Sequence, residues 1–355
     1  MEKKQGEREI WLDAVRGFAI LIVLTVHIIQ AVPEFHDSVS GCGKIGVWLL
    51  FLLTGLFTLR PYLSLDNNGI RQRHRYLTED KDSFKRNESC NGKCFWLSTF
   101  RFYLKRIVRI YPAFLAVLVV SVFTGYIDVP DAVRNFLLIK GTGHFWTLPV
   151  EMKFYFVAPF IGFLLMKLPG DSWRGTMLIT VALVFSVVFF YRNCPENSIE
   201  LGWYLPVLMY GGLINYLIGS KVKVSAAYDV VVLGILAVFI IMVPAVRYIL
   251  FGIPVNRYLS DKYLYISFLW MAFLFSLDRS KYVKRIIEKS RVLPFFGKIS
   301  YSLYLVHYIV IQQSGLFIDD QLRKSLIALV ISLLLAVVLE RMVERPVAKL
   351  AKKIL

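Results

Sequence analysis

Residues 12–27 read LDAVRGFAILIVLTVH, an apolar run that nonetheless contains Asp13, Arg16 and His27. Ionisable side chains inside such a run are costly in a membrane and usually mark a functional site. Arg16 and His27 are eleven residues apart, close to three helical turns, so both side chains project from one face about 16 Å apart. Asp13 lies one turn before Arg16 on that face. The alternative to a functional site is a buried polar patch that pairs two helices.

The composition places this run in a membrane protein. The chain has 355 residues, of which 57% are hydrophobic, and its mean hydropathy is +0.57. Only 19% of the residues are charged, whereas soluble proteins have about 25%. The net charge of +17 would suit a nucleic-acid partner, but the basic residues lie in particular loops. We therefore expect the lipid bilayer as the partner of this charge, and no nucleic acid.

Apolar runs near the length of a membrane span recur along the chain, each requiring about 20 mostly apolar residues. They predict an all-α, polytopic integral membrane protein with about ten transmembrane helices, forming a single domain over residues 1–355. With the N-terminus in the cytoplasm, most of the 42 Lys and Arg fall on the inner side, so both termini are expected to be cytoplasmic. The predicted spans are 10–32, 44–60, 104–127, 145–166, 176–191, 203–219, 226–250, 261–277, 295–314 and 325–343.

The segment 61–103 is the one long loop, basic and cytoplasmic in this orientation, with a mobile middle expected over 66–93. Within the loop, Cys90 and Cys94 are spaced like half of a zinc site, but no second Cys or His pair follows at suitable spacing. We expect two reduced thiols there and no metal site.

The four cysteines do not make a disulfide framework in a chain of this length. Cys42 and Cys194 both fall in predicted outer loops, and their pairing is left open. The sequence also has no P-loop and no glycine-rich dinucleotide fingerprint, which disfavours an ATP-driven pump.

Basic residues cluster where the long loop meets the third predicted span, in the sequence RFYLKRIVRIYP of residues 101–112. Arg106 and Arg109 are three residues apart and share a helix face, with Lys105 beside them. Guanidinium groups suit phosphates, so this cluster is a candidate grip for a phosphorylated cytoplasmic ligand. The alternative is ordinary positive-inside anchoring. Pro112 is expected to lie near the start of the helix, where it would kink it.

A third polar group opens the fourth predicted span, where Glu151 and Tyr155 are four residues apart and share a face, while Lys153 points elsewhere. In the predicted orientation Glu151 and His27 both lie in the outer halves of their spans. A carboxylate and an imidazole at similar depth can form an acid/base pair. The alternative is an interfacial salt bridge from Glu151 to Lys153 or Arg134. The neighbouring His144 is expected to be solvated.

The ninth predicted span carries a polar stripe of Ser300, Tyr304 and His307. Neither Ser300 nor Ser302 lies in a Gly-x-Ser-x-Gly setting, so neither is interpreted as a hydrolase nucleophile. His307 is either a hydrogen-bonding packing residue or part of a pore lining, and the sequence does not decide between them.

Taken in order, these motifs resemble the acyltransferase-3 family of integral membrane acyltransferases over nearly the whole chain. Each motif is weak alone, but six in the same order are specific. Three features depart from the family pattern: Thr54 stands where Ser is common, residues 66–93 are an insert-like stretch, and no extracytoplasmic esterase-like domain is recognised. The matching segments are Leu12-Asp13-x-x-Arg16-Gly17 followed by His27, FLLTG at 51–55, RIVRIYP at 106–112, WTLPVEMKFY at 146–155, SYSLYLVH at 300–307 and ERP at 344–346.

The resemblance implies transfer of an acyl group, usually acetyl, from cytoplasmic acyl-CoA to a hydroxyl of a carbohydrate. The acceptor is expected to be a cell-surface polysaccharide or its lipid-linked glycolipid precursor. Acetyl-CoA would be a donor substrate and not a bound cofactor. The location expected is the inner (plasma) membrane, with multiple passes, and a homodimer is left open.

The site expected from the residues and the resemblance has His27 as general base or transient acyl carrier, with Glu151 orienting it. The rival class is a proton-coupled secondary transporter that uses the same ionisable residues, and a third is a non-catalytic membrane sensor. The remaining assignments place Asp13 and Arg16 along the ligand path, Lys105, Arg106 and Arg109 on the CoA phosphates, and Trp146, Tyr155, Tyr304 and His307 against the substrate.

Overall fold

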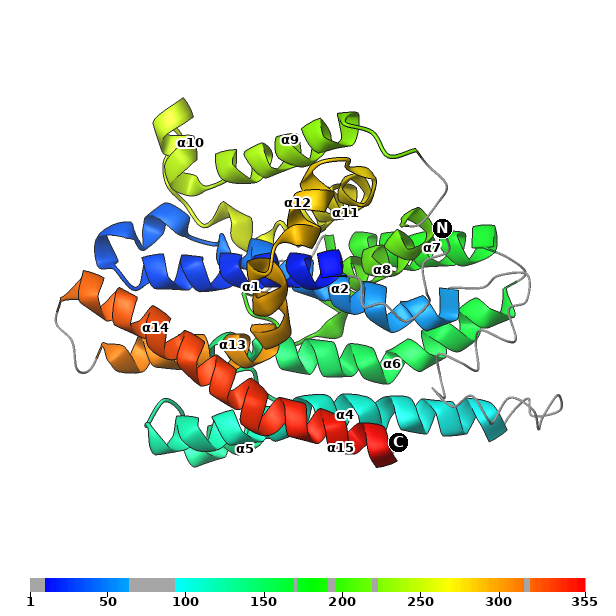
Figure 1. Ribbon diagram of the computed structural model, residues 1–355, viewed down its shortest axis with the longest axis horizontal. Coiled ribbons are helices and arrows are strands. Elements are labelled where there is room, and N and C mark those ends of the chain that lie inside the picture. The colour runs from blue at the N-terminus through cyan, green and yellow to red at the C-terminus, as the bar shows by residue number, and fades with distance from the viewer. Residues whose placement is uncertain are drawn as a thin grey trace. The chain divides into compact units, whose positions relative to one another are not determined.

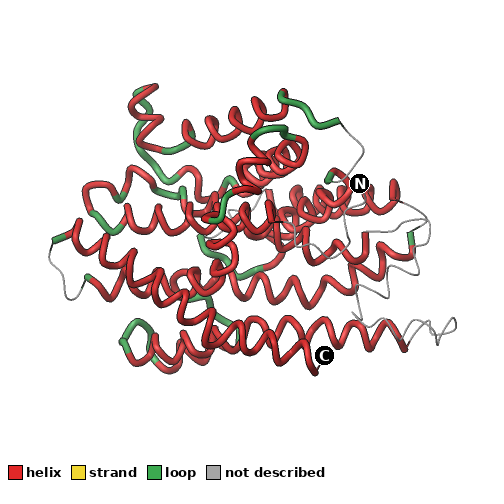
Figure 2. Tube along the Cα trace, viewed as in Figure 1, coloured by secondary structure: helices red, strands yellow, loops and turns green. Residues whose placement is uncertain are grey.

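A computed structural model of the chain describes residues 10–63, 93–168, 171–190, 196–218, 223–315 and 320–354. Helices account for the regular structure of this part of the chain, and Figure 2 shows no strand in it. The principal helices, labelled in Figure 1, are α1 (Ile10–Gln30), α2 (Gly43–Leu63), α4 (Lys93–Phe123), α5 (Val129–Phe136), α6 (Thr147–Lys167), α7 (Asp171–Phe190), α8 (Leu201–Leu217), α9 (Ala227–Ile241), α10 (Pro244–Phe251), α11 (Tyr263–Arg279), α12 (Val283–Lys289), α13 (Val292–Ser314), α14 (Gln321–Leu339) and α15 (Arg345–Ile354).

Each predicted span falls on a helix or, for 226–250, on a pair of helices, so the chain is an all-α, multi-pass membrane protein. Six helical stretches in the described ranges are long and apolar enough to cross a membrane, and the bent pair α9 and α10 would add a seventh. The predicted spans 203–219, 261–277 and 295–314 correspond to α8, α11 and α13, which are not among these seven. The total of about ten spans and the cytoplasmic termini stay predictions.

Three local expectations need correction. The run 226–250 is not one helix, because α9 and α10 meet at a bend of 86°. Val243 is extended before Pro244, since proline disfavours the helical conformation of the residue preceding it. The ends of the expected loop 61–103 are helical, and only 64–92 lies outside the described residues. Pro112 is therefore well inside α4 and not near its start.

The chain divides into two compact units, each made of separate segments. The first comprises Met1–Leu50 and Ile218–Val337, and the second comprises Phe51–Leu217 and Val338–Leu355. In the first unit, Trp270 of α11 is fully buried and donates from Nε1 to the Ile45 carbonyl of α2 over 2.9 Å. This bond satisfies the one polar atom of a buried indole. The rings of Phe18, Phe239 and Phe273 surround it.

The second unit is centred on another aromatic group, in which Phe51 of α2, Trp146 and Tyr204 of α8 are mutually in contact. All three side chains are buried. In the same unit α15 packs along α4, as Figure 1 shows for the chain's last helix.

Helices α1 and α13 approach each other closely through glycine. A Cβ added to Gly17 would overlap the Leu293 carbonyl oxygen, and one added to Gly297 would overlap the Asp13 carbonyl oxygen. Small residues allow membrane helices to pack backbone against backbone in this way. In the second unit, Gly55 of α2 contacts the Leu208 backbone of α8 in the same manner.

Cys42 precedes α2 as a buried free thiol. Its sequence-proposed partner, Cys194, lies outside the described residues, as does Cys90. Burial raises the pKa of the Cys42 thiol to about 12, so it is protonated and shielded at neutral pH. We expect a variant with its other three cysteines replaced by Ser to react with maleimide only after denaturation. Complete labelling of the folded protein within minutes would contradict this assignment.

Candidate functional site

His27 and His307 form a direct hydrogen-bonded pair between α1 and α13. The distance from His27 Nδ1 to His307 Nε2 is 2.9 Å. His307 is fully buried, while His27 is partly exposed. The sequence left His307 open between a packing hydrogen-bonder and a pore lining, and its bonds identify it as a hydrogen-bonder.

The ten-residue spacing of glycine and histidine explains how this pair forms. Gly17 precedes His27 by ten residues, and Gly297 precedes His307 by ten residues. The two helices touch at the glycines and again at the histidines, so α1 and α13 run parallel. Ten residues of helix span about 15 Å, and equal offsets on both helices keep the two rings level.

Asp13 and Arg16 lie on α1 as the spacing predicted, one turn apart and joined by an ion pair of 3.4 Å from Arg16 Nη1 to Asp13 Oδ1. Asp13 is buried and Arg16 is partly buried. Their proposed role along the ligand path stays a prediction.

The polar stripe of α13 is buried as a whole. Ser300 donates to the Gly297 carbonyl over 3.0 Å, which satisfies its hydroxyl within the helix. The ring of Tyr304 lies 5.8 Å from that of His307, centroid to centroid. Tyr304 therefore packs beside the histidine pair.

Glu151 is held by two hydroxyl groups in the second unit. Tyr155 donates to Glu151 Oε1 over 2.6 Å, and Thr54 of α2 donates to the same oxygen over 3.0 Å. The close contact of Gly55 with α8 fixes the part of α2 that carries Thr54. Both hydrogen bonds end on Oε1 and orient the carboxylate, and Oε2 takes part in neither of them. The predicted pairing of Glu151 with His27 joins residues of different units and stays a prediction.

Lys153 does not engage Glu151 but donates from Nζ to the Ile199 carbonyl over 2.8 Å. The predicted divergence of Lys153 from the Glu151–Tyr155 face is therefore confirmed. Arg134, the other suggested partner of Glu151, pairs with Asp131 over 3.3 Å.

Arg106 joins the Glu151 group through Tyr155. Its guanidinium carbon lies 4.7 Å from the Tyr155 ring centroid and 5.2 Å from that of Phe102, a cation–π arrangement with both rings. Arg106 is partly buried, Arg109 is exposed, and Lys105 is partly exposed on the same helix. The aromatic rings contact the faces of the Arg106 guanidinium, while its N–H donors lie in the guanidinium plane and point away from its centre.

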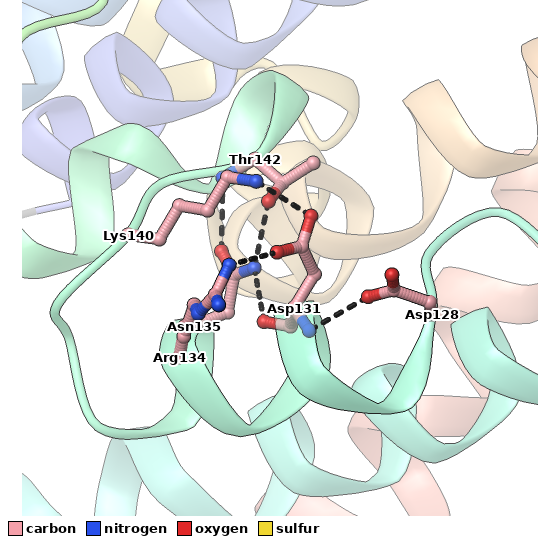
Figure 3. A network of polar contacts seen from close by, with 6 residues as sticks. All are labelled: Asp128, Asp131, Arg134, Asn135, Lys140 and Thr142. Atoms are coloured by element: carbon pink, nitrogen blue, oxygen red, sulfur yellow. Dashed lines mark hydrogen bonds and ion pairs between the residues drawn. The ribbon is translucent and has the colours of Figure 1, made fainter.

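The start of α6, and with it Glu151, is anchored by the turn after α5 (Figure 3). Asn135 donates to the Thr142 hydroxyl over 2.8 Å and accepts from the Thr142 backbone N–H over 2.9 Å. Asp128 caps α5 by accepting from the Asp131 backbone N–H. These local bonds fix the chain just before the 3₁₀ turn Gly143–Trp146 that leads into α6.

That 3₁₀ turn contains His144 and Trp146, and the expected setting of His144 needs correction. His144, expected to be solvated, is buried, with its ring 4.2 Å from that of Phe145. The adjacent aromatic residues fold over it and exclude water, which the position at the start of a span does not reveal. Trp146 is buried against Phe51 and Tyr204, and its proposed contact with substrate stays a prediction.

Asp131 makes the same turn sensitive to pH. A hydrogen bond from Lys140, 2.6 Å long, holds the pKa of Asp131 below its ordinary value of 3.8, with Arg134 adding to the effect. The stabilisation is thus present above pH 3.8 and is lost as pH falls through the lowered pKa. We expect the melting temperature of wild type to exceed that of Asp131→Asn at neutral pH and to converge with it in acid. A difference independent of pH would contradict the ion pair.

Within the described ranges, no group of three or more His, Cys, Asp or Glu side chains is placed to hold a metal ion. The half zinc site suggested by Cys90 and Cys94 cannot be placed, because Cys90 and the Cys94 side chain lie outside what the structure describes.

The family model of the acyltransferase-3 proteins, described as an acyltransferase domain, matches residues 9–341. The chain belongs to the acyltransferase-3 family. Searches of curated proteins and of solved structures found no match. The acyltransferase-3 match contains both the histidine pair and the Glu151 group, and it supports acyltransferase activity in a membrane.

This acyltransferase-3 chain brings its predicted site residues together in two groups, one in each unit. His27 and His307 with Tyr304 make the first, and the second joins Arg106 to Glu151 through Tyr155. Sequence reasoning missed the bond between the histidines and the bond from Thr54 to Glu151. The equal glycine-to-histidine spacing was the signal available for the first, and the Thr54 hydroxyl in FLLTG was the signal for the second.

Proposed function

We propose that this protein transfers an acyl group, most simply acetyl, from cytoplasmic acyl-CoA to a hydroxyl of a carbohydrate. The acceptor is a cell-surface polysaccharide or its lipid-linked precursor, and the protein acts in the inner (plasma) membrane. The observation that carries the proposal is the histidine pair, a basic group on a membrane helix of an acyltransferase-3 chain. An imidazole near neutrality suits proton removal from a hydroxyl.

The reaction requires one proton to move and one acyl bond to be exchanged. His27 takes the proton of the acceptor hydroxyl as its oxygen attacks the thioester carbon. The carbon–sulfur bond then breaks, and the proton passes to the CoA thiolate. Asp13 and Arg16 lie along the path of the thioester, and Glu151 acts with its hydroxyl donors in the second group.

Arg106 and Arg109, with Lys105, bind the phosphates of CoA in this proposal. Arg106 is the sharper test, because its guanidinium is set between Tyr155 and Phe102. Arg106→Lys keeps the charge but loses the planar fork that a phosphate can accept from twice. We expect KM for acyl-CoA to rise about tenfold, the equivalent of about 1.4 kcal/mol, with kcat little changed. An unchanged KM would remove Arg106 from the donor site, and exposed Arg323→Lys serves as the matched control.

The proposed activity is tested with purified protein in liposomes. Radiolabelled acetyl-CoA is supplied with a mixture of envelope glycans or lipid-linked glycans, and release of CoA thiol and label on carbohydrate are both followed. We expect the two to appear together in equal amounts. The transporter class predicts the opposite, namely carbohydrate or proton flux without acyl-CoA and without thiol release.

A further inference from the structure

We infer that His307 is a positioning residue that fixes the tautomer of His27, so that Nε2 of His27 is its basic atom. This inference rests on the proposed function, in which His27 takes the proton of the acceptor hydroxyl. It assigns His307 a role different from the substrate contact expected from the sequence.

The hydrogen bonds of His307 Nδ1 determine the tautomer of His307. Its Nδ1 lies 3.0 Å from the Leu303 carbonyl oxygen and 2.9 Å from the Tyr304 carbonyl oxygen. A carbonyl oxygen only accepts hydrogen bonds, so His307 Nδ1 must carry a proton. The ring is fully buried between apolar helices, where the neutral form is favoured because burying a charge is costly. A neutral imidazole has one donor and one acceptor, and Nε2 of His307 is therefore the acceptor.

The acceptor on His307 determines which nitrogen of His27 is protonated. The two rings are nearly parallel, at 18°, with centroids 5.1 Å apart, and His27 Nδ1 lies 2.9 Å from His307 Nε2. They thus meet edge to edge, as a hydrogen bond requires. Because His307 Nε2 accepts, His27 Nδ1 donates, and the lone pair of His27 is left on Nε2. The Tyr308 ring packs edge-on against His27, 5.2 Å away, and limits rotation of the imidazole.

The lone pair of His27 lies beside a position without a side chain. A Cβ at Gly43 would lie 3.6 Å from His27 Nε2, in van der Waals contact, so glycine at the start of α2 keeps a side chain off this nitrogen. The basic atom therefore lies beside a glycine, while the protonated nitrogen faces the buried partner.

The same bonds stabilise the product of proton transfer. When Nε2 of His27 gains the proton of the acceptor hydroxyl, the imidazolium donates a stronger bond from Nδ1 to His307 Nε2. The two carbonyl oxygens on His307 Nδ1 in turn polarise that ring to accept it. In a Ser-His-Asp triad a buried carboxylate orients the base and stabilises its charged form. Here a neutral histidine anchored by backbone carbonyls does both.

Two substitutions at position 307 separate this role from packing. His307→Gln offers a neutral carbonyl oxygen that can accept from His27 Nδ1, whereas His307→Leu fills similar space without an acceptor. We expect His307→Gln to retain activity within about tenfold of wild type and His307→Leu to lose about 100-fold or more. Equal activity of the two variants, at any level, would overturn the inference.

The tautomer itself is read by nitrogen NMR of ¹⁵N-histidine-labelled protein in lipid, with the His27 signals assigned by their loss in His27→Ala. The wild-type spectrum requires no substitution at position 307 and therefore does not depend on whether those variants fold. We expect Nδ1 of His27 to be protonated and Nε2 unprotonated at neutral pH, with this preference lost in His307→Leu. A protonated Nε2 in the neutral wild-type ring would overturn the inference.

These outcomes distinguish the inference from the proposed function. If His27→Ala transfers acetyl at the wild-type rate, the proposed role of His27 fails whatever its tautomer. If His27→Ala is inactive but His307→Leu matches wild type in rate and tautomer, the positioning role fails and the proposed function stands.

Discussion

His27→Ala is expected to lower the rate of acyl transfer by about 100- to 10,000-fold, the contribution typical of a general acid or base. The reason is structural, because His27 is the partly exposed member of a histidine pair whose other member is fully buried. Removing it leaves the acceptor hydroxyl without a base. The loss should fall on kcat more than on KM for acyl-CoA, since the proposed function assigns the CoA phosphates to other residues. The measurement is steady-state transfer of labelled acetyl in liposomes.

His36→Ala is the matched control for this experiment. His36 lies in a turn of the first unit, where its Nδ1 contacts Asp37 at an exposed position. Its replacement removes an imidazole that is not part of the His27–His307 pair and should leave the rate of acyl transfer unchanged. A folded His27→Ala protein with the same rate as His36→Ala would show that His27 is not catalytic.

Gly297→Ala is expected to destabilise the protein by about 1–3 kcal/mol, as overpacking a close contact does, and to abolish most activity. The added methyl would overlap the Asp13 backbone, which is part of α1 and has no rotamer by which to move aside. Helix α13 must therefore shift relative to α1. The bond between His27 and His307 depends on the same pair of helices and would lengthen. Thermal unfolding in detergent measures the first effect, and the transfer assay measures the second.

Gly234→Ala provides the control for a helical glycine without such a neighbour. No atom lies within 4 Å of the position of its Cβ, and alanine favours helix over glycine. This variant should be neutral or slightly stabilised. Equal melting temperatures and rates for Gly234→Ala and Gly297→Ala would show that α1 and α13 do not depend on glycine contact.

Hydrophobic runs predicted the positions of the helices well, because a membrane span needs a minimum apolar length wherever it occurs. They did not predict the 86° bend between α9 and α10. Counting apolar residues over 226–250 does not reveal that Pro244 keeps Val243 out of the helical conformation. The helical ends of the loop 61–103 were missed because α2 and α4 continue beyond the apolar runs from which the spans were predicted.

Spacing along one helix predicted a common face for Asp13 and Arg16 and for Glu151 and Tyr155. In the structure the side chains of each pair are in contact. Spacing along one helix could not predict contacts between helices. His27 and His307 are 280 residues apart, and no helical periodicity relates residues so far apart in the sequence. The tertiary bond could be predicted only by pairing Gly17 with Gly297 as a close crossing. The burial of His144 likewise depends on neighbours that fold over it from elsewhere in the second unit.

Mass spectrometry of envelope glycans and lipid-linked glycans tests the central claim most directly. Cells expressing wild type, His27→Ala or His36→Ala are compared with cells lacking the protein. We expect a mass gain of one acetyl group on a defined sugar with wild type and His36→Ala, and no such gain with His27→Ala. The same acetylated sugar at the same level in all four samples would contradict it.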